Sequence, residues 1–267
     1  MLTAAALLLS VGRLSAQHSF GFAYYDVDRL YDTLPSPFHN DSGFLPDGAM
    51  RWDSARYNRK VEQVAALIDS MAVPVVALFG VESEGVVNDI ARKCSGYYTC
   101  IHRTQDRLDG LDFALLYYSD VAIPVRTDSG RNFMAVETEI LGRRFVFLLV
   151  NRARNFERLV RNAKMRSPEA AVIAAGDLRD TGFESLGMDD ILAAAEARGQ
   201  GNALFRNGWK MADRIALLGC RVRKCGVYAR RWMLDSHGKP APTFVGTRYR
   251  GGSGRRVPVW CEIEVEQ

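Results

Sequence analysis

Residues 75–82 read Val-Val-Ala-Leu-Phe-Gly-Val-Glu, an apolar run that ends in one acidic side chain. A short apolar run of this kind is typical of a strand buried on both faces. The pattern recurs at 171–177, Ala-Val-Ile-Ala-Ala-Gly-Asp, and an aromatic strand predicted over 19–25 is also followed by acids. The acids that end these three strands are Glu82, Asp177, and Asp26 with Asp28.

Acidic residues at strand ends suit a metal-assisted phosphoryl site, because strand ends hold carboxylates rigidly around a hard cation at one edge of a sheet. Taken singly, each acid is better explained as an ordinary strand-terminal residue. Their order and spacing along the chain favour a shared site.

The rest of the chain carries both helical and strand patterns. Helical spacing covers 56–71, 86–93, 152–166 and 189–198, and a polar segment at 33–48 predicts a long loop. Strand patterns cover 73–81, 113–118, 133–141, 144–151, 171–175, 211–218, 244–249 and 256–265. No internal repeat or low-complexity linker separates these elements. We therefore expect residues 17–267 to form one α+β domain of two mixed sheets flanked by helices.

Composition and charge narrow the class of protein. A chain of 267 residues that is 48% apolar and 10% aromatic has ample material for a core, which excludes a disordered, collagenous or polytopic membrane protein. The net charge of +4 is unevenly distributed: residues 206–256 carry 13 Lys and Arg against two acids, a net of +11, and the remainder carries −7. This segregation, rather than the total, favours an acidic partner.

The amino terminus resembles a secretory signal. Residues 4–11 are apolar, and small residues precede a cleavage point near Gln17, so residues 1–16 are predicted to be a signal peptide; a buried first helix is the alternative. No later stretch is long enough to span a bilayer. We expect a protein secreted across the inner membrane into the periplasm or the medium.

Five cysteines fit an oxidising compartment. Local disulfides are predicted for Cys94 with Cys100 and for Cys220 with Cys225, which leaves Cys261 alone, although other pairings are open. Zinc is disfavoured, because the chain has no C-x-x-C and its four histidines lack ligand spacing.

Motifs in chain order resemble the endonuclease/exonuclease/phosphatase superfamily, the DNase I-like phosphodiesterases, and most closely its bacterial secreted branch. Residues 26–32 stand at that branch's N-V-E-N-L-F-D, and 81–83 resemble its V-E-N. The further matches are 44–48 to F-x-P-x-G, 110–117 to G-I-D-V-A-L-L-Y, 176–180 to G-D-F-N-D, 208–215 to G-x-W-x-x-x-D-Q-I, and 249–252 with 257–259 around the terminal G-G-x-S-D-H-x-P-V.

The resemblance implies a four-layer α/β/β/α sandwich with its active site at one edge. It also implies a mechanism in which Mg²⁺ or Mn²⁺, held by the glutamate, polarises a phosphate. An Asp/Asn pair orients water, and an Asp-supported histidine contacts the phosphate or transfers a proton. Glu82, Asp177 and a supporting Asp213 match this pattern.

Other positions depart from the family pattern. Asp26 and Arg179 stand in place of asparagines, Arg152 in place of a histidine, Arg255 and Arg256 in place of an Asp-His pair, and Asp109 in place of an arginine. Arginine offers no lone pair and stays protonated, so it cannot act as a base. Losing several such groups together predicts a degenerate catalytic site.

Two arrangements of these arginines are open. Arg152, Arg179, Arg255 and Arg256, with Asn151, form an anion-binding cradle if they converge, because guanidinium matches phosphate oxygens. Alternatively, Glu82 and Asp177 neutralise the arginines in a structural network of ion pairs.

Three functions are compatible with these residues. The first is a pseudoenzyme, with no metal required, that binds an anionic ligand: a phosphate ester, nucleic acid, lipid headgroup or acidic protein. The second is an active phosphodiesterase or nuclease that uses Mg²⁺ or Mn²⁺. The third is an envelope scaffold that uses the fold for interaction alone.

Overall fold

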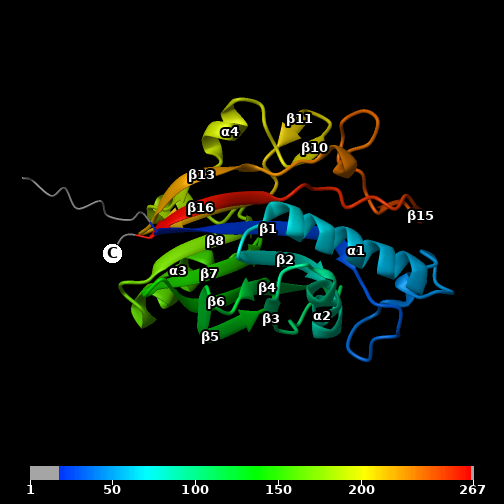
Figure 1. The fold of residues 1–267 in the computed structure, drawn as a ribbon, viewed down its shortest axis with the longest axis horizontal. Helices are drawn as coiled ribbons and strands as arrows, with labels where there is room; N and C mark the ends of the chain where they lie inside the picture. Colours follow the sequence, from blue (N-terminus) through cyan, green and yellow to red (C-terminus); the bar gives the residue numbers. More distant parts are fainter. Residues whose placement is uncertain (1–17, 266–267) are drawn as a thin grey trace, which may run out of the picture.

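Two six-stranded mixed sheets form the centre of the molecule, which the computed structural model describes for residues 18–265 (Figure 1). The first sheet has the order β13 (Arg221–Val227), β16 (Val259–Val265), β1 (His18–Leu30), β2 (Val75–Val81), β4 (Asp112–Tyr118) and β3 (Tyr98–His102). The second has the order β5 (Ala122–Gly130), β6 (Phe133–Ile140), β7 (Arg143–Asn151), β8 (Ala171–Asp177), β12 (Arg214–Leu218) and β9 (Asp189–Asp190). Only β1/β2 and β7/β8 are parallel pairs in these two sheets.

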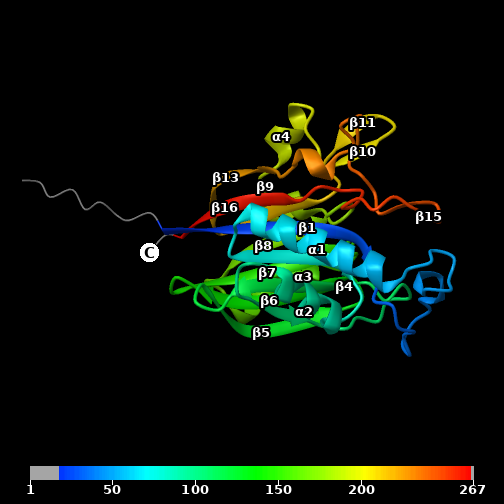
Figure 2. The same cartoon turned by 45° about the vertical axis from the view of Figure 1, so that its right-hand side comes forward.

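Helices cover the outer faces of both sheets (Figure 2). On the first sheet lie α1 (Ser54–Met71) and α2 (Glu84–Lys93), and on the second lies α3 (Phe156–Arg166). Alternation along the strands explains the layers: Phe22 and Tyr24 point between the sheets, whereas Ala23 and Tyr25 point toward α1 and α2. The predicted four-layer α/β/β/α sandwich is therefore confirmed.

Smaller helices and hairpins lie at the rim of the sandwich. They are η1 (Ser42–Phe44), η2 (Phe183–Leu186), α4 (Ala193–Ala197), η3 (Arg231–Met233) and the hairpins β10 (Ala203–Phe205) with β11 (Gly208–Lys210) and β14 (Phe244–Val245) with β15 (Arg248–Tyr249). The strand predicted over 244–249 is thus a hairpin outside the two large sheets, and the helix predicted over 189–198 is β9 followed by the short α4.

The first strand is longer than its sequence pattern predicts. β1 continues past Tyr25 to Leu30, and its pairing with β2 shifts register between Asp26 and Leu30. Asp28 and Arg29 have φ of 57° and 64°, which marks a bulge that redirects the strand. The amide of Asp28 donates to Asp26 Oδ1 at 3.0 Å, so the bulge fixes the Asp26 carboxylate.

The cysteines depart from the prediction. All five are free thiols, so the predicted Cys94–Cys100 and Cys220–Cys225 disulfides are not present. Within each predicted pair the thiols have different partners: Cys94 Sγ lies 4.0 Å from the Ala65 carbonyl, whereas Cys100 Sγ lies 3.2 Å from Asn88 Oδ1. Cys225 is instead the strand partner of Cys261 across β13 and β16.

The predicted signal peptide lies outside the described residues. Among the residues that are described, no helix has the length and apolar character needed to cross a membrane.

Hydrogen bonds from a buried lysine on α1 hold the carboxy-terminal loop in place. Lys60 is 1% exposed, and its Nζ donates to Thr243 Oγ1 at 2.8 Å and to the Ser253 carbonyl. Tyr25 Oη donates to the same carbonyl. Burial lowers the pKa of the Lys60 ammonium to about 8. These bonds position the segment that leads into Arg255 and Arg256.

Replacing Lys60 with alanine is expected to destabilise the protein by about 2–4 kcal/mol, because it leaves a cavity and removes one hydrogen-bond donor from each of two buried oxygens. Urea denaturation measures the change. Lys93→Ala is the control, since Lys93 pairs with Glu62 on the surface, and we expect a change below about 0.5 kcal/mol. Equal, small effects of the two substitutions would contradict the anchoring role.

Candidate functional site

Asp177 lies at the carboxyl end of β8, where the preceding residue has to be glycine. Gly176 has φ of 124°, and a Cβ there would lie 2.1 Å from the Val150 carbonyl oxygen on β7. This close approach of the two backbones buries the Asp177 side chain, which is 5% exposed.

Two arginines bind the Asp177 carboxylate. Arg152 Nε donates to Oδ2 at 3.1 Å, and Arg179 Nε donates to Oδ1 at 2.8 Å. Burial by itself raises the pKa of Asp177, but the hydrogen bonds and charges of Arg179, together with the Arg152 hydrogen bond, hold its pKa below the usual value. Asp177 is therefore an ionised carboxylate whose two oxygens are both occupied by guanidinium groups.

Arg256 joins two further acids. Its NH1 donates to Asp213 Oδ1 and lies 3.4 Å from Asp26 Oδ2. The fully buried Asn202 holds the other oxygen of Asp213 at 2.7 Å. Arg256 thus lies between carboxylates that come from β1 and from the segment before β12.

Electrostatic interactions connect the Asp177 and Arg256 groups into one cluster. Burial, followed by the charges of Asp213 and Asp26, raises the pKa of the Tyr24 phenol well above its usual value. Burial also raises the pKa of Asp26 to about 6, although Arg256 lowers it in part. We call Asp26, Asp177, Asp213, Arg152, Arg179 and Arg256 the arginine–aspartate cluster. Three acids face three arginines in it. Asp177 pairs with arginines as the ion-pair alternative expects, but Asp26 and Asp213 take the place that this alternative gave to Glu82.

Two further residues that were predicted for the anion cradle, Arg255 and Asn151, make other contacts. Arg255 Nε lies 3.6 Å from Asp28 Oδ1, its NH2 donates to the Phe244 carbonyl at 3.3 Å, and it lines a separate cavity of about 440 Å³. Asn151 is the strand partner of Asp177, and its amide donates to the Asn132 carbonyl at 3.0 Å.

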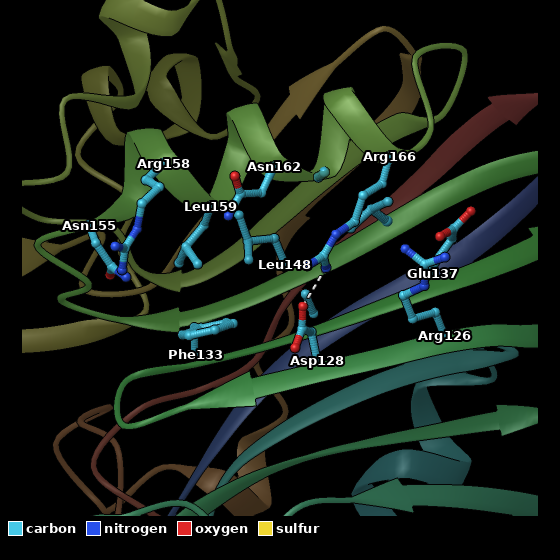
Figure 3. Close-up of a pocket in the computed structure, with 13 residues that line it drawn as sticks. Arg126, Asp128, Phe133, Glu137, Leu148, Asn155, Arg158, Leu159, Asn162 and Arg166 are labelled. Atoms are coloured by element: carbon cyan, nitrogen blue, oxygen red, sulfur yellow. Dashed lines mark hydrogen bonds and ion pairs between the residues drawn. The ribbon is translucent and has the colours of Figure 1, made fainter.

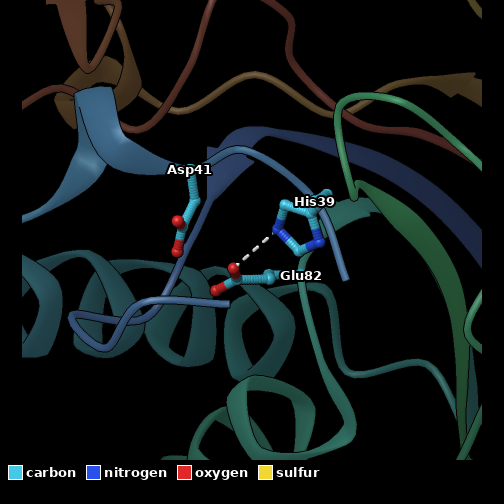
Figure 4. Close-up of side chains that lie close together, drawn as sticks. All are labelled: His39, Asp41 and Glu82. Atoms are coloured by element: carbon cyan, nitrogen blue, oxygen red, sulfur yellow. Dashed lines mark hydrogen bonds and ion pairs between the residues drawn. The ribbon is translucent and has the colours of Figure 1, made fainter. Parts of the chain in front are cut away.

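Glu82 does not contact the arginine–aspartate cluster among the described residues. Its Oε1 lies 2.9 Å from His39 Nε2 (Figure 4). Its Oε2 accepts from the Asp32 amide at 2.6 Å. One ligand atom from each of His39, Asp41 and Glu82 lies within 4.8 Å of the others. Burial raises the pKa of Glu82. The predicted single site is therefore divided into two groups.

A cavity of about 580 Å³ opens beside Glu82. His39 and Arg107 also line it. Arg107 Nε and NH2 donate to the two oxygens of Asp109 at 2.9 and 2.7 Å, and its guanidinium lies over the Phe79 ring at 5.3 Å. An arginine is thus present in this region even though Asp109 stands at the family's arginine position.

Sequence reasoning missed four of these residues, namely His39, Asp41, Arg107 and Asn202. The one available signal was that His39 and Asp41 lie in the polar 33–48 loop, directly before the F-x-P-x-G match. The contact between His39 and Glu82 joins residues 43 positions apart, so spacing along the chain does not reveal it.

The profile of the Endonuclease/Exonuclease/phosphatase family matches residues 21–157. The chain belongs to this family. The match covers β1 to the start of α3, including Asp26 and Glu82. Members of the family are generally metal-dependent. A search of curated proteins gives no match.

Solved structures share the fold at low identity. An endonuclease/exonuclease/phosphatase family protein from Bacteroides thetaiotaomicron has a TM-score of 0.62 at 14% identity, covering 94% of this chain and 99% of that one. A humanized D. rerio TDP2 has a TM-score of 0.59 at 13% identity, covering 92% and 99%. A mannosyl-6-phosphatase from Bacteroides thetaiotaomicron has 0.60 at 15%, covering 92% and 99%. The structural similarity to these proteins shows that the chain has the DNase I-like fold.

The family's metal does not fit the arginine–aspartate cluster. A divalent cation needs free carboxylate oxygens, and Asp177 and Asp213 already bind fixed cations at short range. Glu82 and Asp41 differ, because neither makes an ion pair with arginine or lysine among the described residues. Within residues 18–265, the Glu82 group is the one set of three or more His, Cys, Asp or Glu side chains whose ligand atoms lie close enough together for a metal ion.

A further cavity of about 210 Å³ lies between α3 and the second sheet (Figure 3). Phe133, Leu148 and Leu159 line it, and Arg166 forms an ion pair with Asp128 at its side. It contains none of the residues that sequence analysis predicted for the site.

The raised pKa of Asp26 predicts a pH dependence. Folded Asp26 keeps its proton up to about pH 6, whereas an unfolded aspartate loses it near ~3.9. Its contribution to stability is therefore complete below about pH 4 and is lost as the pH rises through about 6. We expect the free energy of unfolding of the wild type, relative to Asp26→Asn, to fall by on the order of 1–3 kcal/mol over that interval.

Urea denaturation of both proteins across that pH interval measures this difference. A difference that does not change with pH, or that grows as the pH rises, would contradict the burial of Asp26 next to Asp213.

Proposed function

We propose that the chain is a secreted member of the endonuclease/exonuclease/phosphatase family that binds a phosphate-bearing anion and has lost most metal-dependent hydrolysis. Secretion rests on the signal-like residues 1–16. The proposed function rests on the arginine–aspartate cluster. Its ion pairs stand where the family is expected to have its catalytic groups.

Exposed guanidinium groups in the cluster support anion binding. Arg152 and Arg179 have side chains that are 58% and 42% exposed. Arg152 donates to Asp177 through Nε alone, so both of its terminal nitrogens are available among the described residues. Arginine forks match two phosphate oxygens at once. One solved neighbour, a D. rerio TDP2, is complexed with a single-stranded DNA product, which makes nucleic acid a suitable first probe.

The loss of hydrolysis follows from the chemistry of arginine. Arg256 bonds to Asp213, the arrangement in which the family is expected to have an Asp-supported histidine. A guanidinium does not accept a proton near neutral pH, so proton transfer at this position is lost. Asp177 is also unable to orient water while both of its oxygens accept from arginines. General acid–base groups contribute about 10²- to 10⁴-fold each in rate.

One observation favours an active phosphodiesterase as the second candidate. Glu82 keeps a carboxylate without an arginine partner, beside a cavity that Arg107 also lines. Chemistry there would rely on Glu82 and Arg107, and the arginine–aspartate cluster would serve only to bind the substrate.

Turnover assays separate the two candidates. With bis-p-nitrophenyl phosphate or plasmid DNA, and Mg²⁺ or Mn²⁺, we expect a rate close to that of the buffer, and no further loss in Asp177→Asn or Glu82→Gln. Metal-dependent turnover that Glu82→Gln abolishes would support the second candidate. Turnover that Asp177→Asn abolishes would overturn the proposal that the cluster is catalytically inert.

Binding assays test the anion site itself. Fluorescence anisotropy with a labelled single-stranded oligonucleotide is expected to show binding that weakens as salt increases. The double variant Arg152→Ala/Arg179→Ala is expected to bind at least about tenfold more weakly, since each lost charge-assisted bond contributes about 1.5–3 kcal/mol. Arg161→Ala is the matched control, because Arg161 is exposed on α3 and pairs with Glu157. Equal affinity in both variants would exclude the cluster as the binding site.

A further inference from the structure

We infer that Cys225 on β13 and Cys261 on β16 form a reversible disulfide that links the edge strand of the first sheet to its neighbour, with a small-molecule disulfide of the glutathione type as the oxidant. The structure shows the reduced form, in which both residues are free thiols. The inference goes beyond the proposed function, because it concerns neither the arginine–aspartate cluster nor phosphate esters.

The first support is the register of the two strands, which run side by side in both views of the fold (Figures 1 and 2). Cys225 is directly opposite Cys261 in the antiparallel pair. Residues that face each other in this way point to the same side of the sheet. Cys261 lies in the core between the sheets with Val259 and Ile263, and Cys225 packs against that core. The two thiols therefore share one face of the sheet.

The second support is the hydrogen-bonding pattern, which makes the two cysteines a close pair. The amide of Tyr228 donates to the Pro258 carbonyl at 2.8 Å, as in a hydrogen-bonded pair. Hydrogen-bonded and non-hydrogen-bonded pairs alternate along antiparallel strands, and the register has no shift over 224–227. Cys225 and Cys261 are therefore a non-hydrogen-bonded pair, the kind with Cα atoms about 4.5 Å apart and the closer side chains. Disulfides accept Cα separations of about 4.4–6.8 Å.

The third support is the mutual influence of the thiols. Burial, followed by the charges of Cys220 and Cys225, raises the pKa of the Cys261 thiol well above its usual value. Both neighbours are thus within electrostatic reach of the buried sulfur. Within residues 18–265, no set of three side chains with the spacing of metal ligands includes these cysteines. The arrangement therefore suits a disulfide rather than a thiolate–metal site.

The oxidation follows ordinary thiol–disulfide exchange. Cys225 reacts first, because it is half-buried whereas Cys261 is fully buried. Once its thiol has lost the proton that it donates to the Ile191 carbonyl, the Cys225 sulfur attacks the oxidant, releases one small thiol and forms a mixed disulfide. The Cys261 thiolate then attacks the Cys225 sulfur and releases the second small thiol. Two protons and two electrons from the cysteines thus reduce one small-molecule disulfide to two thiols.

The disulfide would strengthen a weakly held part of the sheet. β13 is an edge strand, and within the sheet it pairs with β16 alone. A bond between Cys225 and Cys261 closes a loop that contains η3, the β14–β15 hairpin and Arg256. Closing a loop stabilises a protein mainly by restricting its unfolded chain. We therefore expect the Tm of the oxidised protein to exceed that of the reduced protein by at least about 5 °C.

Peptide mapping of the full chain tests the pairing. The reduced protein is incubated with oxidised glutathione, both folded and during refolding from urea, because burial raises the pKa of both thiols and is expected to slow exchange in the folded chain. Trypsin cleaves after Arg221 and Lys224, so Cys220, Cys225 and Cys261 fall in three different peptides. We expect mass spectrometry without reduction to show the Cys225 and Cys261 peptides linked, and separated again by dithiothreitol.

Variants test the effect on stability. Cys225→Ser is expected to abolish both the linked peptide and the difference in Tm between oxidised and reduced protein. Cys94→Ser is the matched control, because Cys94 is also half-buried but packs on the helix side of the first sheet, and it is expected to keep both.

Three results would overturn the inference: a main linkage of Cys220 to Cys225 or to Cys261, glutathione attached to Cys225 without a link to Cys261, or no disulfide under either condition. The wild-type map decides the pairing even where a variant does not fold. Because the test supplies the oxidant, none of these outcomes depends on secretion, anion binding or turnover.

Discussion

The bond between Arg256 and Asp213 is the interaction on which the character of this site depends. It occurs where the family is expected to use a histidine supported by an aspartate, and it adds a permanent positive charge between Asp213 and Asp26. A buried ion pair of this kind persists only when its remaining polar atoms are satisfied. Asn202 does this for Asp213, and the bulge in β1 does it for Asp26.

Much of the fold was predictable because its central strands are apolar and continuous. The longer strands that sequence patterns missed, the five- to nine-residue β3, β5 and β13, all lie at sheet edges. Edge strands contact the core on fewer sides and carry features that prevent pairing with other chains, such as Pro124 in β5 and the basic residues Arg221, Arg223 and Lys224 in β13. The basic segment 206–256, which causes the uneven charge distribution of the chain, therefore includes the edge strand β13.

The site was predictable in part. The motifs indicated that Asp26, Asp177 and Arg256 lie close together. Asp26 and Asp177 lie on β1 and β8, where strand pairing fixes their register, and Arg256 forms an isolated bridge with Ala203 shortly before β16. They did not indicate that Glu82 bonds to His39 and to the Asp32 amide, since strand ends specify an edge of a sheet but not which loop covers it. The 33–48 loop brings His39 onto Glu82, and such a contact between distant segments depends on loop conformation that no periodicity encodes.

Fixed positive charge occupies both carboxylate oxygens of Asp177, which a metal ion at that end of the site would need free. An anomalous difference map from a crystal soaked in Mn²⁺ tests it most directly. We predict no manganese peak in contact with Asp177 or Asp213, and unchanged bonds from Arg152 and Arg179. A peak that bridges Asp177 and Glu82, with the two arginines displaced, would contradict the account.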